Sequence, residues 1–148
     1  MEQNLNNQIY SSRLLKAPLA KVYKAFETPE HLTKWWGPEG FTNTFHEFDL
    51  RPNGTWKLTM HGPDKGHYEN EAVFTIVEPM RLIAWRRVSK PLFNMEVTFE
   101  SISALETKIA FRMLFDTAEE CNKIKAFAIP KNEENFDRLE KELSNVLV

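Results

Sequence analysis

The chain has 148 residues, of which 42% are apolar and 27% are charged, and this composition excludes an intrinsically disordered protein. Nineteen lysine and arginine residues stand against 21 aspartate and glutamate residues, which argues against a nucleic-acid partner, since such binders carry a clear basic excess. No apolar run approaches the roughly 20 residues of a membrane span. Aromatic residues make up 12% of the chain, a surplus that must fill a core or line a pocket.

The cysteine content and the N-terminal sequence indicate a soluble cytoplasmic protein. Cys121 is the only cysteine, so no intramolecular disulfide can form. The first eight residues are polar and lack the apolar core of a signal peptide, and we expect residues 1–8 to form a loose tail. No linker, repeat or low-complexity tract divides the chain, which predicts a single domain over residues 1–148.

The first predicted elements are a strand and two short helices. Pro18 suits the first position of a helix, where its missing N–H costs nothing, and apolar residues follow it at helical spacing. Thr28 has the pattern of an N-cap that opens a second helix. We expect these elements at residues 9–16, 18–27 and 29 to 35 or 36.

From residue 43 to residue 116 the apolar pattern changes from a period of 3.6 to a period of two, which is typical of strands. Asn53-Gly54 between two apolar runs is a strong signal for a tight hairpin. Apolar and charged residues alternate along the strands, so one face of the sheet is exposed to solvent and helices must cover the apolar face. We expect strands at residues 48–50, 56–60, 68–77, 81–89, 95–99 and 109–115.

The C-terminal part of the chain predicts one long helix. Residues 117–130 have no clear pattern, although Phe127 and Ile129 can cover an apolar surface. Asn132, followed by acidic residues, is typical of a helix start, because the helix dipole favours negative charge there. The sequence therefore predicts an α+β fold in which a curved antiparallel sheet of six or seven strands wraps around a helix at residues 131–148.

Sequence signals for metal, nucleotide or nucleophilic chemistry are missing. His31, His46, His61 and His67 lack the close spacing of metal ligands, and the single cysteine adds no second soft ligand. No P-loop, dinucleotide-binding glycine motif or G-x-S-x-G motif occurs in the sequence. We therefore expect no metal site, no cofactor and no catalytic residue, and an enzyme is the less favoured class.

Aromatic and methionine side chains are the best candidates for a binding site. On three strands they recur in the inward phase, and they should meet the apolar stripe of the last helix. A filled core and a ligand pocket both explain this pattern, because methionine adapts to either. The candidate pocket residues are Trp35, Trp36, Phe41, Trp56, Met60, Tyr68, Trp85, Arg87, Met95, Phe99, Phe111, Met113, Phe136 and Leu139.

Adjacent tryptophans on a helix cannot face the same core direction, so one of Trp35 and Trp36 should lie inside and the other at a rim. Arg87 shares a strand face with Trp85 if that residue is buried. A guanidinium at the edge of a pocket can bind a ligand carboxylate through two parallel hydrogen bonds. Pairing with a protein acid such as Glu71 is the favoured alternative.

Several segments resemble, in register, the family named for the activator of Hsp90 ATPase, within the START/Bet v 1-like group. The resemblance covers about residues 9–147 and implies the helix-grip fold. The segments are Ala17-Pro18, Thr28-Pro29-Glu30-His31-Leu32, Lys34-Trp35-Trp36-Gly37-Pro38, Gly40-Phe41, residues 49–56, residues 78–85 and Phe136-Asp137-Arg138-Leu139.

Two positions depart from the family pattern. Asn53 stands where the family has the first glycine of a pair, a mild change because Asn also tolerates left-handed backbone angles. The Gly-Trp that precedes the final helix in the family is missing, and Phe136 is the nearest aromatic residue.

The resemblance leaves three functions open, since relatives in the larger group bind lipids or hormones, catalyse cyclisations or assist a chaperone. The leading hypothesis is a domain that binds an apolar or amphipathic small molecule between the sheet and the last helix. A cavity below about 100 Å³ would exclude it. The first alternative is a protein-interaction module with a chaperone partner. The second is a cyclase- or aromatase-like enzyme, which needs a polar group with a displaced pKa in the cavity.

Overall fold

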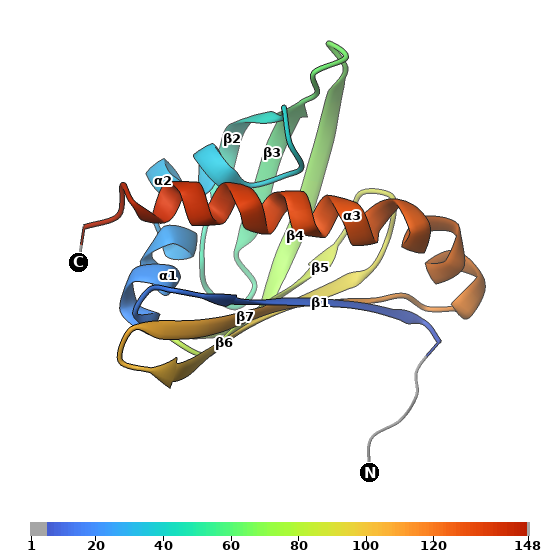
Figure 1. Ribbon diagram of the computed structural model, residues 1–148. Helices are drawn as coiled ribbons and strands as arrows, with labels where there is room; N and C mark the ends of the chain where they lie inside the picture. The colour runs from blue at the N-terminus through green and yellow to red at the C-terminus, as the bar shows by residue number, and fades with distance from the viewer. Residues whose placement is uncertain (1–5, 148) are drawn as a thin grey trace.

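The structure is a computed structural model that describes residues 6–147 as one antiparallel sheet with two short helices and one long helix (Figure 1). The strands are β1 Gln8–Leu15, β2 Thr42–Phe48, β3 Thr55–His61, β4 His67–Glu78, β5 Leu82–Arg87, β6 Asn94–Ser103 and β7 Glu106–Leu114. The helices are α1 Leu19–Glu27, α2 Pro29–Trp35 and α3 Ala118–Leu143. The predicted α+β helix-grip architecture is confirmed.

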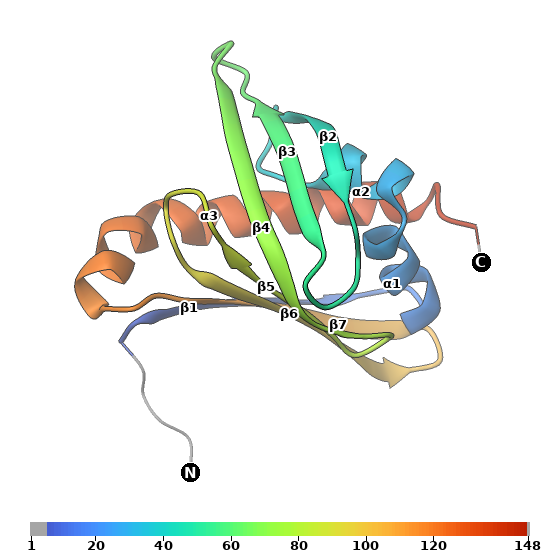
Figure 2. The same cartoon turned by 180° about the vertical axis from the view of Figure 1, so that it is seen from behind.

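The seven strands follow the order β1-β7-β6-β5-β4-β3-β2, and every neighbouring pair is antiparallel. The sheet curves around α3, which crosses its concave side (Figure 1). Helices α1 and α2 connect the two edge strands and lie beside the second half of α3, whereas the β3–β4 hairpin extends past α3 (Figures 1 and 2). The two halves of α3 therefore have different neighbours.

The early elements agree with the sequence analysis to within a few residues. Pro18 directly precedes α1, and its carbonyl accepts the N–H of Val22 at 3.1 Å. Thr28 precedes α2, but its side chain makes no capping hydrogen bond. Asn53 has a φ of +70°, the left-handed angle that the turn before β3 requires.

Strand β2 differs from the prediction, because only Phe48 belongs to the segment expected at residues 48–50. It is an edge strand without a fully buried side chain, so its sequence shows little alternation. At the N-terminus, Asn7 is bound to Phe115 by two hydrogen bonds, and β1 begins at the next residue. For residues 1–5 the expected loose tail lies outside the described residues.

Helix α3 is longer than predicted. It begins at Ala118, where the Thr117 hydroxyl caps it by accepting the N–H of Glu120 at 3.1 Å, and it contains Pro130. The prediction of a start near residue 131 was wrong because the first half of α3 carries no continuous apolar stripe. Only Cys121 and Ala128 are buried in this half, which leaves little periodicity to detect.

The core lies between the concave face of the sheet, the short helices and the second half of α3. Phe26, Trp35 and Trp56 are each 2% exposed or less. The ring of Phe26 meets those of Trp35 and Trp56 edge to face, and Trp35 Nε1 donates to the carbonyl of Ala25 at 2.9 Å. Most of the aromatic surplus therefore fills a core.

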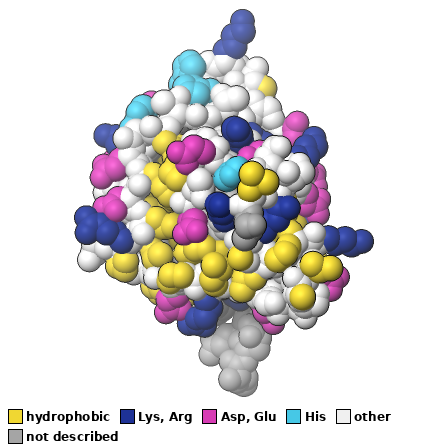
Figure 3. All heavy atoms as spheres, turned by 90° about the vertical axis from the view of Figure 1, so that its left-hand side faces the viewer, with side chains coloured by type: hydrophobic (Ala, Val, Ile, Leu, Met, Phe, Trp, Pro, Cys, Tyr) yellow, Lys and Arg dark blue, Asp and Glu magenta, His cyan; other side chains and the backbone are white. Residues whose placement is uncertain are grey.

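Charge is evenly distributed on one side of the molecule, where acidic and basic side chains are interspersed around apolar ones (Figure 3). Within residues 6–147, no helix is both long enough and apolar enough to cross a membrane.

Candidate ligand groove

The register of β4 and β5 determines which side chains reach the concave face. Ala72 pairs with Arg87 and Phe74 pairs with Trp85, and paired residues lie on the same face. Because Trp85 is buried, Arg87 also points toward the concave side, as predicted. Its neighbour Arg86 is exposed on the opposite face.

The same alternation applies to the start of β4. Tyr68 pairs with Met60, and Asn70 pairs with Leu58. Leu58 is part of the buried core, so Tyr68 and Asn70 lie on the concave side. Glu69 is exposed on the other face, where it accepts a hydrogen bond from Thr59.

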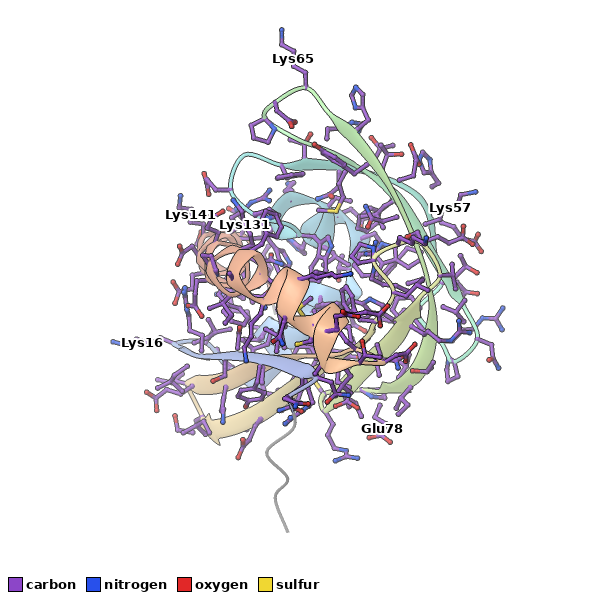
Figure 4. All side chains as sticks on the ribbon, turned by 90° about the vertical axis from the view of Figure 1, so that its right-hand side faces the viewer. Lys16, Lys57, Lys65, Glu78, Lys131 and Lys141 are labelled. Atoms are coloured by element: carbon purple, nitrogen blue, oxygen red, sulfur yellow. The ribbon has the colours of Figure 1, made fainter. Side chains whose placement is uncertain are left out.

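A groove of about 580 Å³ opens between this part of the sheet and the first half of α3. Its floor is the concave face of β3, β4 and β5, and its sides are the segment after α2, the β5–β6 loop and α3. Figure 4 views this side, with Lys65 at the tip of the β3–β4 hairpin and Lys131 on the helix opposite. The groove is lined by Pro38, Phe41, Met60, His67, Tyr68, Glu69, Asn70, Arg87, Lys90, Pro91 and Phe127.

Arg87 is held by the loop that follows its strand. Its Nε donates to the carbonyl of Pro91 at 2.7 Å, and its Nη2 donates to the carbonyl of Lys90 at 3.2 Å and to Ser89 Oγ at 3.3 Å. The guanidinium also lies over the ring of Phe93, with its carbon 5.4 Å from the ring centre. The favoured pairing with Glu71 is not formed, because backbone carbonyls of the loop take the place of a carboxylate.

Arg87 lies between two open spaces, because it lines both the groove and a neighbouring depression of about 290 Å³. Asp116 lines that depression too, but it forms no ion pair with Arg87. Burial lowers the pKa of Arg87 to about 10, which leaves the guanidinium charged at neutral pH.

Beyond the β5–β6 loop, a third depression of about 470 Å³ reaches α3 at Ile124 and shares Lys90 and Pro91 with the groove. The open space therefore follows the whole first half of α3, on both sides of the loop.

The wall formed by Pro38 and Phe41 is fixed by Arg138 of α3. This guanidinium donates hydrogen bonds of 2.9 to 3.1 Å to five backbone carbonyls between Lys34 and Phe41. Gly37 turns the chain there with a φ of +98°, and a Cβ at this position would lie 2.8 Å from the terminal carbon of Met60. Arg138 and a turn that favours glycine therefore both hold the wall in place.

The structure divides the fourteen predicted pocket residues. Four of them, Phe41, Met60, Tyr68 and Arg87, come together in the groove. Nine are buried in the core and do not line it: Trp35, Trp56, Trp85, Met95, Phe99, Phe111, Met113, Phe136 and Leu139. Helices α1 and α2 insert aromatic rings against these side chains, which fills the space between them.

Trp36 is the remaining predicted residue. It is half-buried and its ring packs against those of Trp35, Trp56, Trp85 and Phe111. Trp36 therefore lies at the edge of the core. Trp35 lies inside, as expected for one member of an adjacent tryptophan pair.

Sequence reasoning did not select the loop residues Lys90 and Pro91, nor Phe127 of α3, as lining residues. Phe127 is 65% exposed, and it carried a signal, namely a large apolar residue in a stretch without apolar periodicity. Nothing in the sequence pattern connects the β5–β6 loop to a site in space.

The histidines do not form a metal centre with other ligands. His61 and His67 face each other across the β3–β4 hairpin, with their Nδ1 atoms 2.7 Å apart. His31 bonds to the buried Glu142 at 2.7 Å. Among residues 6–147, no group of three or more histidine, cysteine or acidic side chains could hold a metal ion.

Solved structures with the same fold have little sequence identity to this chain. A protein of Nitrosomonas europaea has a TM-score of 0.87 and 19% identity, with 97% of each chain covered. A protein of Rhodobacter sphaeroides has a TM-score of 0.85 and 17% identity over 97% of this chain and 95% of its own. The AHSA1 protein of Silicibacter pomeroyi has a TM-score of 0.74 and 15% identity over 93% and 98%.

The fold and the groove define the class of the protein: an α+β helix-grip protein with an open groove between its sheet and its C-terminal helix. The sequence model of the family described as "Activator of Hsp90 ATPase homolog 1-like protein" matches residues 16–144, and the chain belongs to this family. No curated protein sequence matches the chain.

Proposed function

We propose that this protein binds an apolar or amphipathic small molecule, without covalent chemistry, in the groove between the sheet and α3. The groove itself supports the proposal, because about 580 Å³ lies within the range of roughly 300–1,000 Å³ typical of small-molecule sites. Phe41, Met60, Tyr68 and Phe127 supply apolar surface from four different segments. A ligand would cover side chains that are now exposed to water.

Two of the polar groups that line the groove, Arg87 and Tyr68, are poor bases at neutral pH. Arg87 stays protonated there, because its pKa is lowered only to about 10. The phenol of Tyr68 donates to Asp64 at 2.9 Å, and this hydrogen bond raises the pKa of Tyr68 above its ordinary value. Neither of these two groups can act as a general base near pH 7.

Native mass spectrometry of freshly purified protein is the direct test, and we expect a co-purifying small molecule. A titration with the neutral dye N-phenyl-1-naphthylamine, which fluoresces in apolar surroundings, then measures the affinity of the groove for an apolar ligand. Phe127→Ala should weaken dye binding about three- to tenfold through the loss of apolar contact. Leu105→Ala is the matched control, because Leu105 is 69% exposed, similar to Phe127 at 65%, but does not line the groove.

The proposal is wrong if the wild-type protein neither carries a small molecule nor binds the dye. Equal weakening by both substitutions would place the dye elsewhere on the surface. If a chaperone is instead the partner, as the family resemblance allows, its binding should be unaffected by Phe127→Ala.

A further inference from the structure

Arg87 offers an unused hydrogen-bonding face in the groove. A guanidinium has five N–H donors, and the loop carbonyls and Ser89 engage only Nε and Nη2. Among the described residues, Nη1 has no hydrogen-bond acceptor and no carboxylate lies within ion-pair distance of Arg87. Nη1 is not among the fully buried atoms without a partner, and Arg87 lines the groove.

The guanidinium of Arg87 is also held in position before any ligand binds. The β5–β6 loop fixes one edge through hydrogen bonds, and Phe93 lies against its face. A side chain that is already immobilised loses little entropy when a ligand binds. A partly buried cation without an anion is unfavourable, and a bound anion would offset that cost.

The charges around the groove indicate a ligand with one negative charge. Arg87 and Lys90 are the cationic lining residues, whereas Glu69, which borders the groove, lies on the other face of β4 and accepts a hydrogen bond from Thr59. A phosphate monoester carries nearly two negative charges and three acceptor oxygens, which a single free guanidinium nitrogen does not match. A carboxylate, with one charge and two oxygens, fits better.

We propose that Arg87 binds the carboxylate of an amphipathic ligand whose apolar chain lies against Met60, Tyr68 and Phe127. This assignment rests on the proposed function, because it names the chemical class of the molecule in the same groove. The loop carbonyls orient the guanidinium toward the carboxylate, and the aromatic side chains contact the apolar chain. The groove therefore suits both parts of a fatty-acid-like molecule.

Three compounds with the same chain and different head groups test the assignment on the wild-type protein. Dodecanoate, dodecan-1-ol and dodecylammonium each compete with N-phenyl-1-naphthylamine at neutral pH. A charge-assisted hydrogen bond predicts that dodecanoate binds at least about tenfold more tightly than dodecan-1-ol. Dodecylammonium should bind most weakly, since it brings a second cation next to Arg87.

Variants then test whether the preference for dodecanoate depends on Arg87. Arg87→Met should reduce the affinity for dodecanoate to that for dodecan-1-ol, whereas Arg87→Lys should keep part of the preference. Arg86→Gln is the matched control, since Arg86 is the next residue on the same strand but is exposed on the other face, and it should keep the full preference.

The outcomes separate the two proposals. If no compound and no dye binds the wild-type protein, both proposals fail. If dodecan-1-ol binds as tightly as dodecanoate, or if folded Arg87→Met retains the preference, the groove remains a binding site and the role of Arg87 is wrong. Should Arg87→Met not fold, the wild-type comparison and Arg87→Lys decide.

Discussion

The two ends of the concave face differ in what covers them. At one end, Phe26 of α1 and Trp35 of α2 are fully buried, and the ring of Phe26 packs against those of Trp56 and Trp85 on the sheet. At the other end, the first half of α3 offers one large aromatic side chain, Phe127, and it is mostly exposed. The same sheet and helix therefore build a close-packed core at one end and a groove at the other.

This difference explains the aromatic surplus of the chain. Aromatic rings pack closely together where the short helices lie, and Trp36 contacts both Trp56 and Trp85. Where no short helix intervenes, Phe41, Tyr68 and Phe127 line open space. In this chain, the segment between β1 and β2 supplies the helices α1 and α2, whose aromatic side chains fill the space at one end of the concave face.

Truncating one phenylalanine at each end gives the largest expected contrast. Phe26→Ala should lower the free energy of unfolding by about 3–5 kcal/mol, because it removes a fully buried ring from five aromatic neighbours. Phe127→Ala should change it by less than about 0.5 kcal/mol. Urea unfolding followed by tryptophan fluorescence measures both, and similar losses would contradict the division into a packed end and an open end.

Arg138 connects the two ends, because it binds the carbonyls of the segment that leads from Trp35 to the groove wall. Arg138→Met should cost about 2–3 kcal/mol of stability, since several carbonyls lose a charged donor. It should also weaken dye binding, because Pro38 and Phe41 are no longer held in place.

Arg81→Met is the control for the loss of a surface arginine. Arg81 forms one exposed ion pair with Glu78, so its removal should cost less than about 1 kcal/mol and leave the groove intact. If both variants are equally stable, the hydrogen bonds of Arg138 contribute little to the fold.

Much of the fold could be predicted because it follows from local patterns. Alternation in β3–β7 and the turn at Asn53-Gly54 are properties of neighbouring residues, and the inward direction of Arg87 followed from that of Trp85. The start of α3 could not be predicted in this way, since an exposed helix needs no apolar stripe.

The candidate site was less predictable, because it depends on which inward side chains remain uncovered. Trp56 and Met60 lie on the same face of β3, yet Trp56 is in the core and Met60 lines the groove. The contacts that separate them come from Trp36 and Phe127, which are distant in the sequence from β3. Periodicity identifies a face, but only the packing of the helices decides which end of that face is filled.

Two tyrosines give the smallest and most specific comparison between the ends. The pKa of Tyr23, in the core, is raised mainly by burial, whereas that of Tyr68 is raised by its hydrogen bond to the Asp64 carboxylate. The pKa of Asp64 is lowered, first by the N–H of Gly66 and then by the Tyr68 hydroxyl. The directions agree for the two phenols, but the causes differ.

Asp64→Asn should therefore move the ionisation of Tyr68 to lower pH and leave that of Tyr23 unchanged, as followed by tyrosinate absorbance. A raised phenol pKa stabilises the folded state below the unfolded pKa, and this contribution disappears as the pH rises through the folded value. The lowered Asp64 pKa acts in the opposite direction, so its contribution is present above the unfolded pKa and disappears as the pH falls through the folded value. Because Asp64 and Tyr68 are exposed, both effects on stability are small, and the absorbance titration is the decisive measurement. Superimposable titrations of the wild-type and variant proteins would show that the hairpin carboxylate does not control Tyr68, and the open end would then lack the electrostatic coupling that distinguishes it from the core.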